Sequence, residues 1–318
     1  MNKIKLAFFG APDFAATVLK SIIEDKKLPV ELKFVVTQPD RPAGRKQALT
    51  PTPVKLLAQE KSISVYDNFK SEIVNLKLKE IDLVLLYAFG EIIPTEMLKL
   101  PPQGFWNIHP SLLPKYRGPS PITYPLFLGD AVTGVSLIQM DERMDHGPII
   151  SQETYTIQNE DTQETLKKSL SNIGYKLFKN NVQLLIDGAL QKKEQIHENA
   201  TYNRLLTKQD GFIPFPLFQK IVREEALTKD DILPIIQAYF KKYGPSLSFN
   251  FQLSAFNLFR ALSPWPGLWS LIPVDGVEKR LKITGMKLTD DNRPLITTVQ
   301  LEGKKEVPLS TFLSAYTI

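Results

Sequence analysis

Short apolar runs alternate with amphipathic stretches along the first half of the chain. Runs of apolar and β-branched residues, each with the length of a buried strand, occupy residues 4–10, 32–38, 83–88, 104–109 and 134–140. Between the first of these runs, apolar positions recur with helical spacing over residues 14–23, 54–60 and 71–78. Strands that alternate with helices predict an α/β fold built on a doubly wound, mostly parallel, Rossmann-like sheet.

The pattern changes in the second half of the chain. Helical spacing over residues 161–190 predicts one long helix, and Asp161 followed by Glu164 has the spacing of a capping box at its start. Further helices are predicted at 216–225, 228–242 and 254–262, the second of them interrupted by Pro234. From residue 268 onward, strand patterns at 268–274, 279–288 and 294–303 alternate with turn residues, as in a small OB-like β-barrel.

These patterns predict two domains and a connection. We expect a first domain over residues 1–190, a polar linker over 191–213 and a second domain over 214–318. Within the second domain, residues 214–250 form a helical insertion whose role the sequence does not indicate. A chain of 318 residues is long enough for two hydrophobic cores.

Composition and charge exclude several classes of protein. The chain has no cysteine, which excludes disulfides, thiolate metal sites and a cysteine nucleophile. No stretch reaches the roughly 18 apolar residues of a membrane span, and the first apolar run is too short for a signal peptide. We therefore expect a cytoplasmic protein. The net charge of +5 comes mainly from residues 201–318, where an anionic partner would fit.

The candidate chemistry lies at the ends of two predicted strands. The dinucleotide-binding and phosphate-loop glycine motifs are absent. Asn107 and His109 are two residues apart at a strand end, so their side chains face the same way and could stabilise an oxyanion. The acidic segment with Asp141, Glu142 and Asp145 follows another strand and could supply a carboxylate beside the histidine. A structural histidine at a strand end remains the alternative on composition alone.

Two longer stretches carry a family resemblance. "NIHPSLLPKYRGPSPI" and "GVSLIQMDERMDHGPII" resemble the catalytic domain of the folate-dependent formyltransferases. The resemblance implies that Asn107, His109 and Asp145 are catalytic and that 10-formyltetrahydrofolate is the formyl donor, with no metal. It also implies a folate pocket formed by Ser111, Leu112, Leu113, Pro114, Tyr87, Ala88, Phe89, Gly90, Ile92 and Asp141. His146 stands where the family usually has a small residue, and we expect its side chain to point to solvent.

Other stretches resemble the branch of the family that acts on methionyl-tRNA. They are "TQPDRPAGRKQALTPTPVKLLA" and, in the C-terminal part of the chain, "TYNRLLTKQDGFI", "FRALSPWPGLW" and "LEGKKEVPLSTFLSAY". The resemblance implies that initiator methionyl-tRNA is the acceptor, and that a basic loop and the second domain contact it. The residues expected to contact the tRNA are Arg41, Arg45, Lys46, Lys304 and Lys305. We expect a monomer, although the sequence does not determine the oligomeric state.

Two alternatives differ in what they leave unexplained. An N-formyltransferase acting on sugar amines or other small molecules shares the Asn, His and Asp set, but has no use for the basic loop and the second domain. A non-catalytic RNA-binding translation factor would use the basic surfaces, but would have no need for the three intact catalytic side chains.

Overall fold

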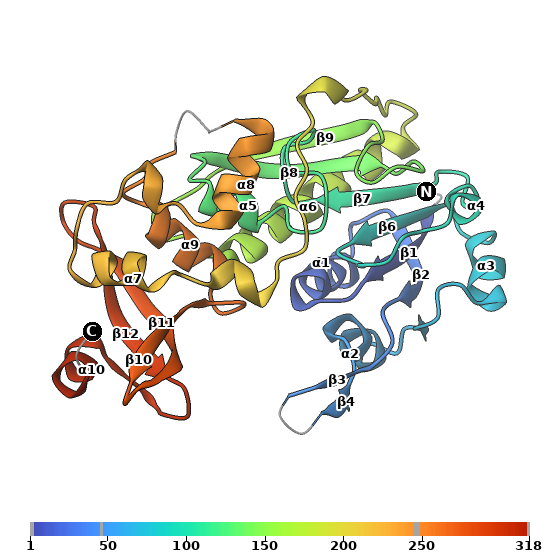
Figure 1. Ribbon diagram of the computed structural model, residues 1–318. Coiled ribbons are helices and arrows are strands. Elements are labelled where there is room, and N and C mark those ends of the chain that lie inside the picture. Colours follow the sequence, from blue (N-terminus) through green and yellow to red (C-terminus); the bar gives the residue numbers. More distant parts are fainter. Residues whose placement is uncertain (1–2, 45–46, 245–248, 317–318) are drawn as a thin grey trace. The chain divides into compact units, whose positions relative to one another are not determined.

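A seven-stranded, mostly parallel sheet organises the first half of the chain. In the computed structural model, which describes residues 3–44, 47–244 and 249–316, the strand order is β5-β2-β1-β6-β7-β8-β9 (Figure 1). The strands are β1 (Ile4–Gly10), β2 (Val30–Val36), β5 (Val65–Tyr66), β6 (Leu83–Tyr87), β7 (Phe105–His109), β8 (Val132–Gln139) and β9 (Ile149–Thr156). The first five strands in this order pair in parallel, and β8 pairs antiparallel with β7. The predicted Rossmann-like sheet is confirmed.

Helices cover both faces of this sheet. The helices that accompany the sheet are α1 (Asp13–Glu24), α2 (Pro53–Glu60), α3 (Glu72–Leu78), α4 (Thr95–Leu98) and the long α6 (Gln163–Ile186). One face packs a cluster with Phe9 and Phe105 at its centre against α3 and α4. The other face meets α1 and α6, where Phe178 of α6 packs edge-on against Trp106 of β7. The buried strands carry apolar residues on both faces for this reason.

The long helix begins two residues later than its predicted cap. Thr162 and Thr165 exchange hydrogen bonds between side chain and backbone in both directions, so they form the capping pair of α6. Asp161 instead accepts hydrogen bonds from the backbone N–H of Gln158 and the hydroxyl of Thr165. The prediction of Asp161 and Glu164 as the capping box is wrong, because a threonine hydroxyl both donates and accepts and can fill the third position of the box.

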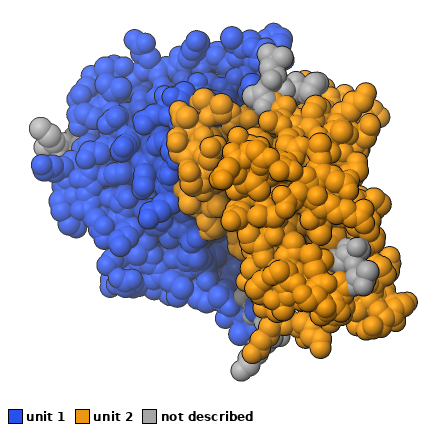
Figure 2. All heavy atoms as spheres, turned by 90° about the vertical axis from the view of Figure 1, so that its left-hand side faces the viewer, with its two compact units in different colours: residues 1–121, 133–155, 167–203 blue, residues 122–132, 156–166, 204–318 orange. Residues whose placement is uncertain are grey.

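The chain divides into two compact units whose sequences are interleaved (Figure 2). Unit 1 contains residues 1–121, 133–155 and 167–203, and unit 2 contains residues 122–132, 156–166 and 204–318. Within unit 2, α5 (Thr123–Phe127) packs on α9 (Ser254–Leu262). The short segments 122–132 and 156–166 therefore belong to unit 2, although the residues on both sides of each belong to unit 1.

An antiparallel sheet forms the C-terminal part of unit 2. Its order is β10-β11-β12-β13, with β10 (Leu268–Val274), β11 (Val277–Leu288), β12 (Pro294–Leu301) and β13 (Glu306–Pro308), followed by α10 (Leu309–Ala315). Asp275 and Gly276 both have positive φ and form the two-residue hairpin between β10 and β11. The three predicted strands are confirmed as members of this sheet.

The segment that the sequence predicts to be a helical insertion contains α7 (Phe215–Val222) and α8 (Pro234–Tyr243). Pro234 is the first residue of α8, and a short 3-10 turn over Lys229–Asp231 precedes it. The prediction that Pro234 interrupts a helix over 228–242 is therefore wrong. Proline is favoured at the first position of a helix, where its missing N–H leaves no hydrogen bond unmade. None of the helices in the described residues is long and apolar enough to cross a membrane.

Candidate active site

Strand β7 presents Asn107 and His109 on one face of the sheet. The intervening Ile108 points to the opposite face, where it contacts Gly174 of α6 so closely that a Cβ there would collide with it. Asn107 pairs with Leu86 of β6 and Ile138 of β8, so the strand is held on both sides. Both polar side chains are buried. Because residues two apart in a strand lie on the same face of the sheet, the amide of Asn107 and the imidazole of His109 lie in the same region.

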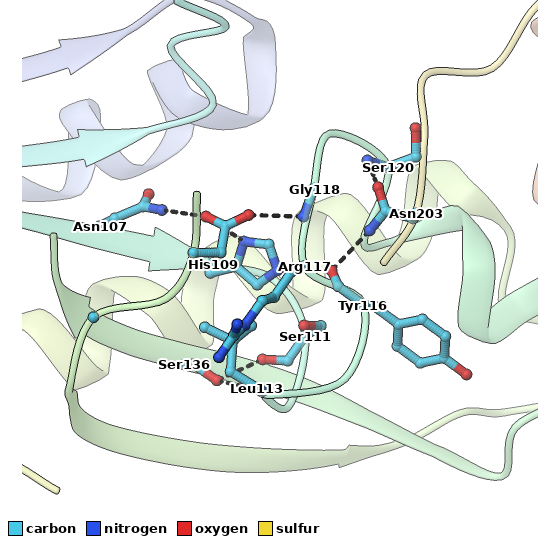
Figure 3. A network of polar contacts seen from close by, with 12 residues as sticks. Asn107, His109, Ser111, Leu113, Tyr116, Arg117, Gly118, Ser120, Ser136 and Asn203 are labelled. Carbon is cyan, nitrogen blue, oxygen red and sulfur yellow. Dashed lines mark hydrogen bonds and ion pairs between the residues drawn. The ribbon is translucent and has the colours of Figure 1, made fainter. Parts of the chain in front are cut away.

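Asp145 lies beside both side chains. Its Oδ1 accepts a hydrogen bond from Asn107 Nδ2 at 3.4 Å and lies 3.4 Å from His109 Nδ1. Its Oδ2 accepts from the backbone N–H of Gly118 at 2.7 Å. Asn107, His109 and Gly118 face this position from β7 and from the turn that follows it (Figure 3). The structure therefore brings together the three residues that the sequence comparison with formyltransferases assigned to catalysis.

The second ring nitrogen of His109 is held by the backbone. Its Nε2 lies 3.1 Å from the carbonyl oxygen of Tyr116. A carbonyl oxygen can only accept, so Nε2 donates, and Nδ1 is the nitrogen that faces the carboxylate of Asp145. An imidazole that faces two acceptors donates to both of them only when it carries both protons. With both nitrogens protonated, the ring would donate from Nε2 to Tyr116 O and from Nδ1 to the carboxylate of Asp145.

The turn after β7 is fixed by Ser136. The Ser136 hydroxyl donates to Ser111 O and accepts from Leu113 N, at 2.7 and 3.0 Å. The Ser111 hydroxyl donates to Lys115 O, so it is used within the turn. Ser111 and Leu113 are buried, and Leu112 and Pro114 are half-buried. Of the expected folate-binding side chains in this turn, Leu112 and Pro114 are the accessible ones.

The segment after β6 exposes main-chain groups, rather than most of its expected side chains, to a ligand. Tyr87 and Phe89 are buried in the core, where burial raises the pKa of Tyr87 and its hydroxyl hydrogen-bonds to Ser171. Ala88 and Gly90 have positive φ, which turns the chain sharply. Ile92 is 80% exposed. A ligand at this segment would meet main-chain groups and Ile92, not the two aromatic side chains.

A cavity of about 710 Å³ lies between α4 and the segment after β8. Its volume is in the range usual for small-ligand sites. Of the residues expected to bind folate, Asp141 lines this cavity, together with His146, Met140, Glu142, Arg143 and residues of the 95–104 segment. The remaining expected folate residues do not line it.

His146 is engaged within the protein. Its Nδ1 lies 2.7 Å from Asp141 Oδ2, and its ring stacks on that of His197 with centroids 4.0 Å apart and planes 6° apart. The prediction that His146 points to solvent is wrong. The sequence could not reveal its ring partner, which lies 51 positions further along the chain.

The basic loop folds back as a small hairpin. Strands β3 (Arg41–Ala43) and β4 (Ala48–Thr50) pair antiparallel, and the Arg41 side chain is 64% exposed, 3.8 Å from Glu91. Arg45 and Lys46 lie outside the described residues. Lys55 bridges Asp40 and Asp67, and these hydrogen bonds raise its pKa. Lys304 and Lys305 are exposed on the turn between β12 and β13 of unit 2.

Some residues that hold the candidate catalytic side chains in place were not predicted from the sequence. Gly118 and Tyr116 act on Asp145 and His109 through backbone atoms, and Gln195 donates to the backbone of Asp145 at 2.9 Å. Tyr116 and Gly118 lie within a stretch that carries the family resemblance, which was the available signal. For Gln195, in the expected linker, no signal was present. Among the described residues, no three His, Cys, Asp or Glu side chains cluster as a metal site would need.

Comparison with known proteins identifies the family. Residues 3–182 match the formyl transferase family. A methionyl-tRNA formyltransferase of Geotalea daltonii is 30% identical over 99% of this chain and 96% of its own length, and one of Kosmotoga olearia is 41% identical over 66% and 68%. A 4-N formyltransferase from Francisella tularensis has the same fold, with a TM-score of 0.58 at 16% identity over 87% of this chain and 96% of its own. The chain therefore belongs to the formyl transferase family.

Proposed function

We propose that the protein transfers the formyl group of 10-formyltetrahydrofolate to the α-amino group of initiator methionyl-tRNA. One observation carries the proposal: Asn107, His109 and Asp145 converge in a chain that is similar over nearly its whole length to curated methionyl-tRNA formyltransferases. The likeness to these methionyl-tRNA formyltransferases extends over unit 2 as well as unit 1.

In the proposed reaction the substrate supplies the nucleophile. An α-amino group has a pKa near 7.7, so a useful fraction is neutral at about pH 7. Its nitrogen bonds to the formyl carbon, and the bond from that carbon to N10 of the folate breaks. Asn107 donates an Nδ2–H to the oxyanion that develops on the formyl oxygen, and the positive charge of a protonated His109 ring stabilises the same oxyanion. Asp145 orients His109 and relays the proton lost by the amine toward N10 through water.

The proposed folate site combines the cavity at Asp141 with the exposed backbone after β6. Main-chain donors and acceptors at Ala88 and Gly90, with Ile92 and Leu112 as apolar surface, suit a flat heterocycle with polar edges. The side chains of Asn107, His109 and Asp145 themselves supply an amide, an imidazole and a carboxylate, which are the groups that this chemistry needs.

The proposed tRNA contacts lie outside the catalytic cluster. Arg41 on the β3–β4 hairpin, with Arg45 and Lys46 in the same loop, would neutralise phosphates of the acceptor stem. Lys304 and Lys305 would do so from the second domain, which we place at residues 214–318 after a linker at 191–213. We propose that the protein acts as a monomer.

One assay tests the proposal. Purified protein is incubated with 10-formyltetrahydrofolate and methionyl-tRNA, and acid-stable formylmethionine is measured after deacylation. Charged elongator tRNA and a free amino sugar serve as parallel acceptors. Formylation of the initiator tRNA is expected. Formylation of the amino sugar alone would establish the small-molecule alternative, and RNA binding without any transfer would establish a non-catalytic factor.

A further inference from the structure

Residues 195–203 run beside the turn that holds the catalytic histidine and aspartate, within unit 1. The backbone N–H of Arg117 donates to the carbonyl oxygen of Thr201 at 2.8 Å. The backbone N–H of Tyr116 donates to the hydroxyl of Thr201 at 2.9 Å. Asn203 N donates to Arg117 O at 2.8 Å. This segment follows the family match, which ends at residue 182, and its sequence resembles a polar linker. In the structure it is a strap on the candidate active site.

Arg117 is the anchor of this strap. Its guanidinium is buried, with 1% of the residue exposed. Its Nε and Nη2 both donate to Gln195 Oε1, at 3.2 and 2.7 Å. The guanidinium also donates to His197 Nδ1 at 2.8 Å and to the Tyr202 hydroxyl at 3.1 Å. Burying a guanidinium is unfavourable unless its N–H groups are hydrogen-bonded. Three residues of the strap therefore provide the partners that make this burial tolerable.

Arg117 also determines which way the Gln195 amide faces. A guanidinium carries donors only, so the amide oxygen of Gln195 must face Arg117. The amide nitrogen is then directed to the other side, where it donates to Asp145 O at 2.9 Å and to Gly147 O at 2.8 Å. Gln195 thus holds both carbonyls that flank His146.

The backbone held by Gln195 is in an unfavourable conformation. Asp145 has φ of +50°, in the left-handed region that is unfavourable for a residue other than glycine. Its carboxylate must nevertheless reach His109 and Gly118 together. We propose that Gln195, oriented by Arg117, is a positioning residue that holds Asp145 in this conformation for formyl transfer, an inference that rests on the proposed function.

A second contact between the same segments supports this role. His197 follows Gln195 by two positions and accepts from Arg117 at Nδ1, because a guanidinium can only donate. Its ring stacks on His146, the residue between the two carbonyls that Gln195 holds. Gln195 thus holds the backbone of the loop from Asp145 to Gly147, and His197 holds the side chain of His146 in the same loop.

Gln195→Glu is the sharpest test. Glutamate has the same shape and still accepts from Arg117, but it has no N–H for the carbonyls of Asp145 and Gly147. We expect kcat to fall about tenfold to a hundredfold, as for small misplacements of a catalytic group, with KM for both substrates changed less than about threefold. Gln195→Met removes the donors and also the Oε1 acceptor of Arg117 without adding a charge, and we expect at least the same kcat deficit. Glu198→Gln, on an exposed residue of the same strap, is the matched control and should resemble wild type.

A double substitution separates positioning from general damage to the fold. If Gln195 acts through Asp145, then Gln195→Glu added to Asp145→Asn should lower the single-turnover rate by less than about twofold further. A full multiplicative loss would overturn the proposal, as would wild-type kcat in either Gln195 variant with an unchanged circular dichroism spectrum. An inactive wild-type protein would refute the proposed function, whereas an active wild type with equally active variants would refute only the positioning role.

Discussion

His109 Nδ1 lies 3.4 Å from Asp145 Oδ1, although 36 positions separate the two residues in the chain. The distance is at the long end for a direct hydrogen bond, and apo active sites commonly have such contacts, which tighten when substrate is bound. The opposite ring nitrogen is held by Tyr116 O and the opposite carboxylate oxygen by Gly118 N. Both side chains are thus fixed at their far ends and face each other at their near ends.

Asp145→Asn should lower kcat by about a thousandfold. The amide can present an N–H to His109 Nδ1 in place of an acceptor, which favours a neutral ring over the doubly protonated ring that we assign to formyl transfer. Steady-state kinetics with methionyl-tRNA measures the loss, and binding of tetrahydrofolate to the variant should be retained. A variant with near-normal kcat would show that the carboxylate is dispensable.

Asn107→Ala should lower the rate of formyl transfer about a hundredfold or more. The substitution removes an amide N–H from the position where we place the oxyanion, and the loss of one such donor commonly has this magnitude. Its effect on affinity for tRNA, measured by filter binding, should be small. Unchanged transfer by a folded Asn107→Ala protein would contradict the assignment of the oxyanion site.

Arg41→Ala should raise KM for tRNA and reduce its dependence on salt. Loss of one phosphate contact lowers the slope of log KM against log salt concentration by about 1. Arg41 is exposed and its ion pair with Glu91 is long, so the fold should not depend on it. Lys33→Ala, which removes a surface charge that pairs with Glu31 on β2, is the control. An identical salt series for Arg41→Ala and wild type would remove the hairpin from the tRNA site.

Asp25→Asn should reduce stability at neutral pH and make it less sensitive to acid. Hydrogen bonds from Lys179, Tyr175 and the backbone of Lys27 hold the pKa of Asp25 well below its usual range. A carboxyl whose pKa is depressed by folding stabilises the protein above its unfolded pKa of about 3.9, and this contribution is lost as the pH falls below that value. The hydrogen-bonded ion pair is partly exposed, so we expect a loss of about 1 kcal/mol at pH 7.

Thermal unfolding at a series of pH values measures this contribution. The difference in Tm between wild type and Asp25→Asn should be largest near pH 7 and should shrink below about pH 4. Glu24→Gln is the control, because Glu24 is exposed and its contact with Lys20 is 3.8 Å long. A Tm difference that stays constant into acid would show that the cluster does not depend on the charge of Asp25.

The buried strands could be predicted because burial on both faces leaves a continuous apolar record in the sequence. β1, β6 and β7 are of this kind. β9 was not predicted, since it lies at the edge of the sheet and carries polar residues such as Gln152 and Glu153 at exposed or half-exposed positions. The β3–β4 hairpin was missed for the same reason, because its residues bury little apolar surface.

The sequence by itself determined the fold class and the family, and it predicted Asn107, His109 and Asp145 as site residues, because strand periodicity and characteristic motifs depend on side-chain type. The tertiary structure alone decided how these groups are held. Tyr116 O, Gly118 N and the carbonyls bound by Gln195 are backbone atoms, which every residue possesses and no motif records. The stacking of His146 on His197 likewise joins segments far apart in the chain, so only folding brings the two rings together.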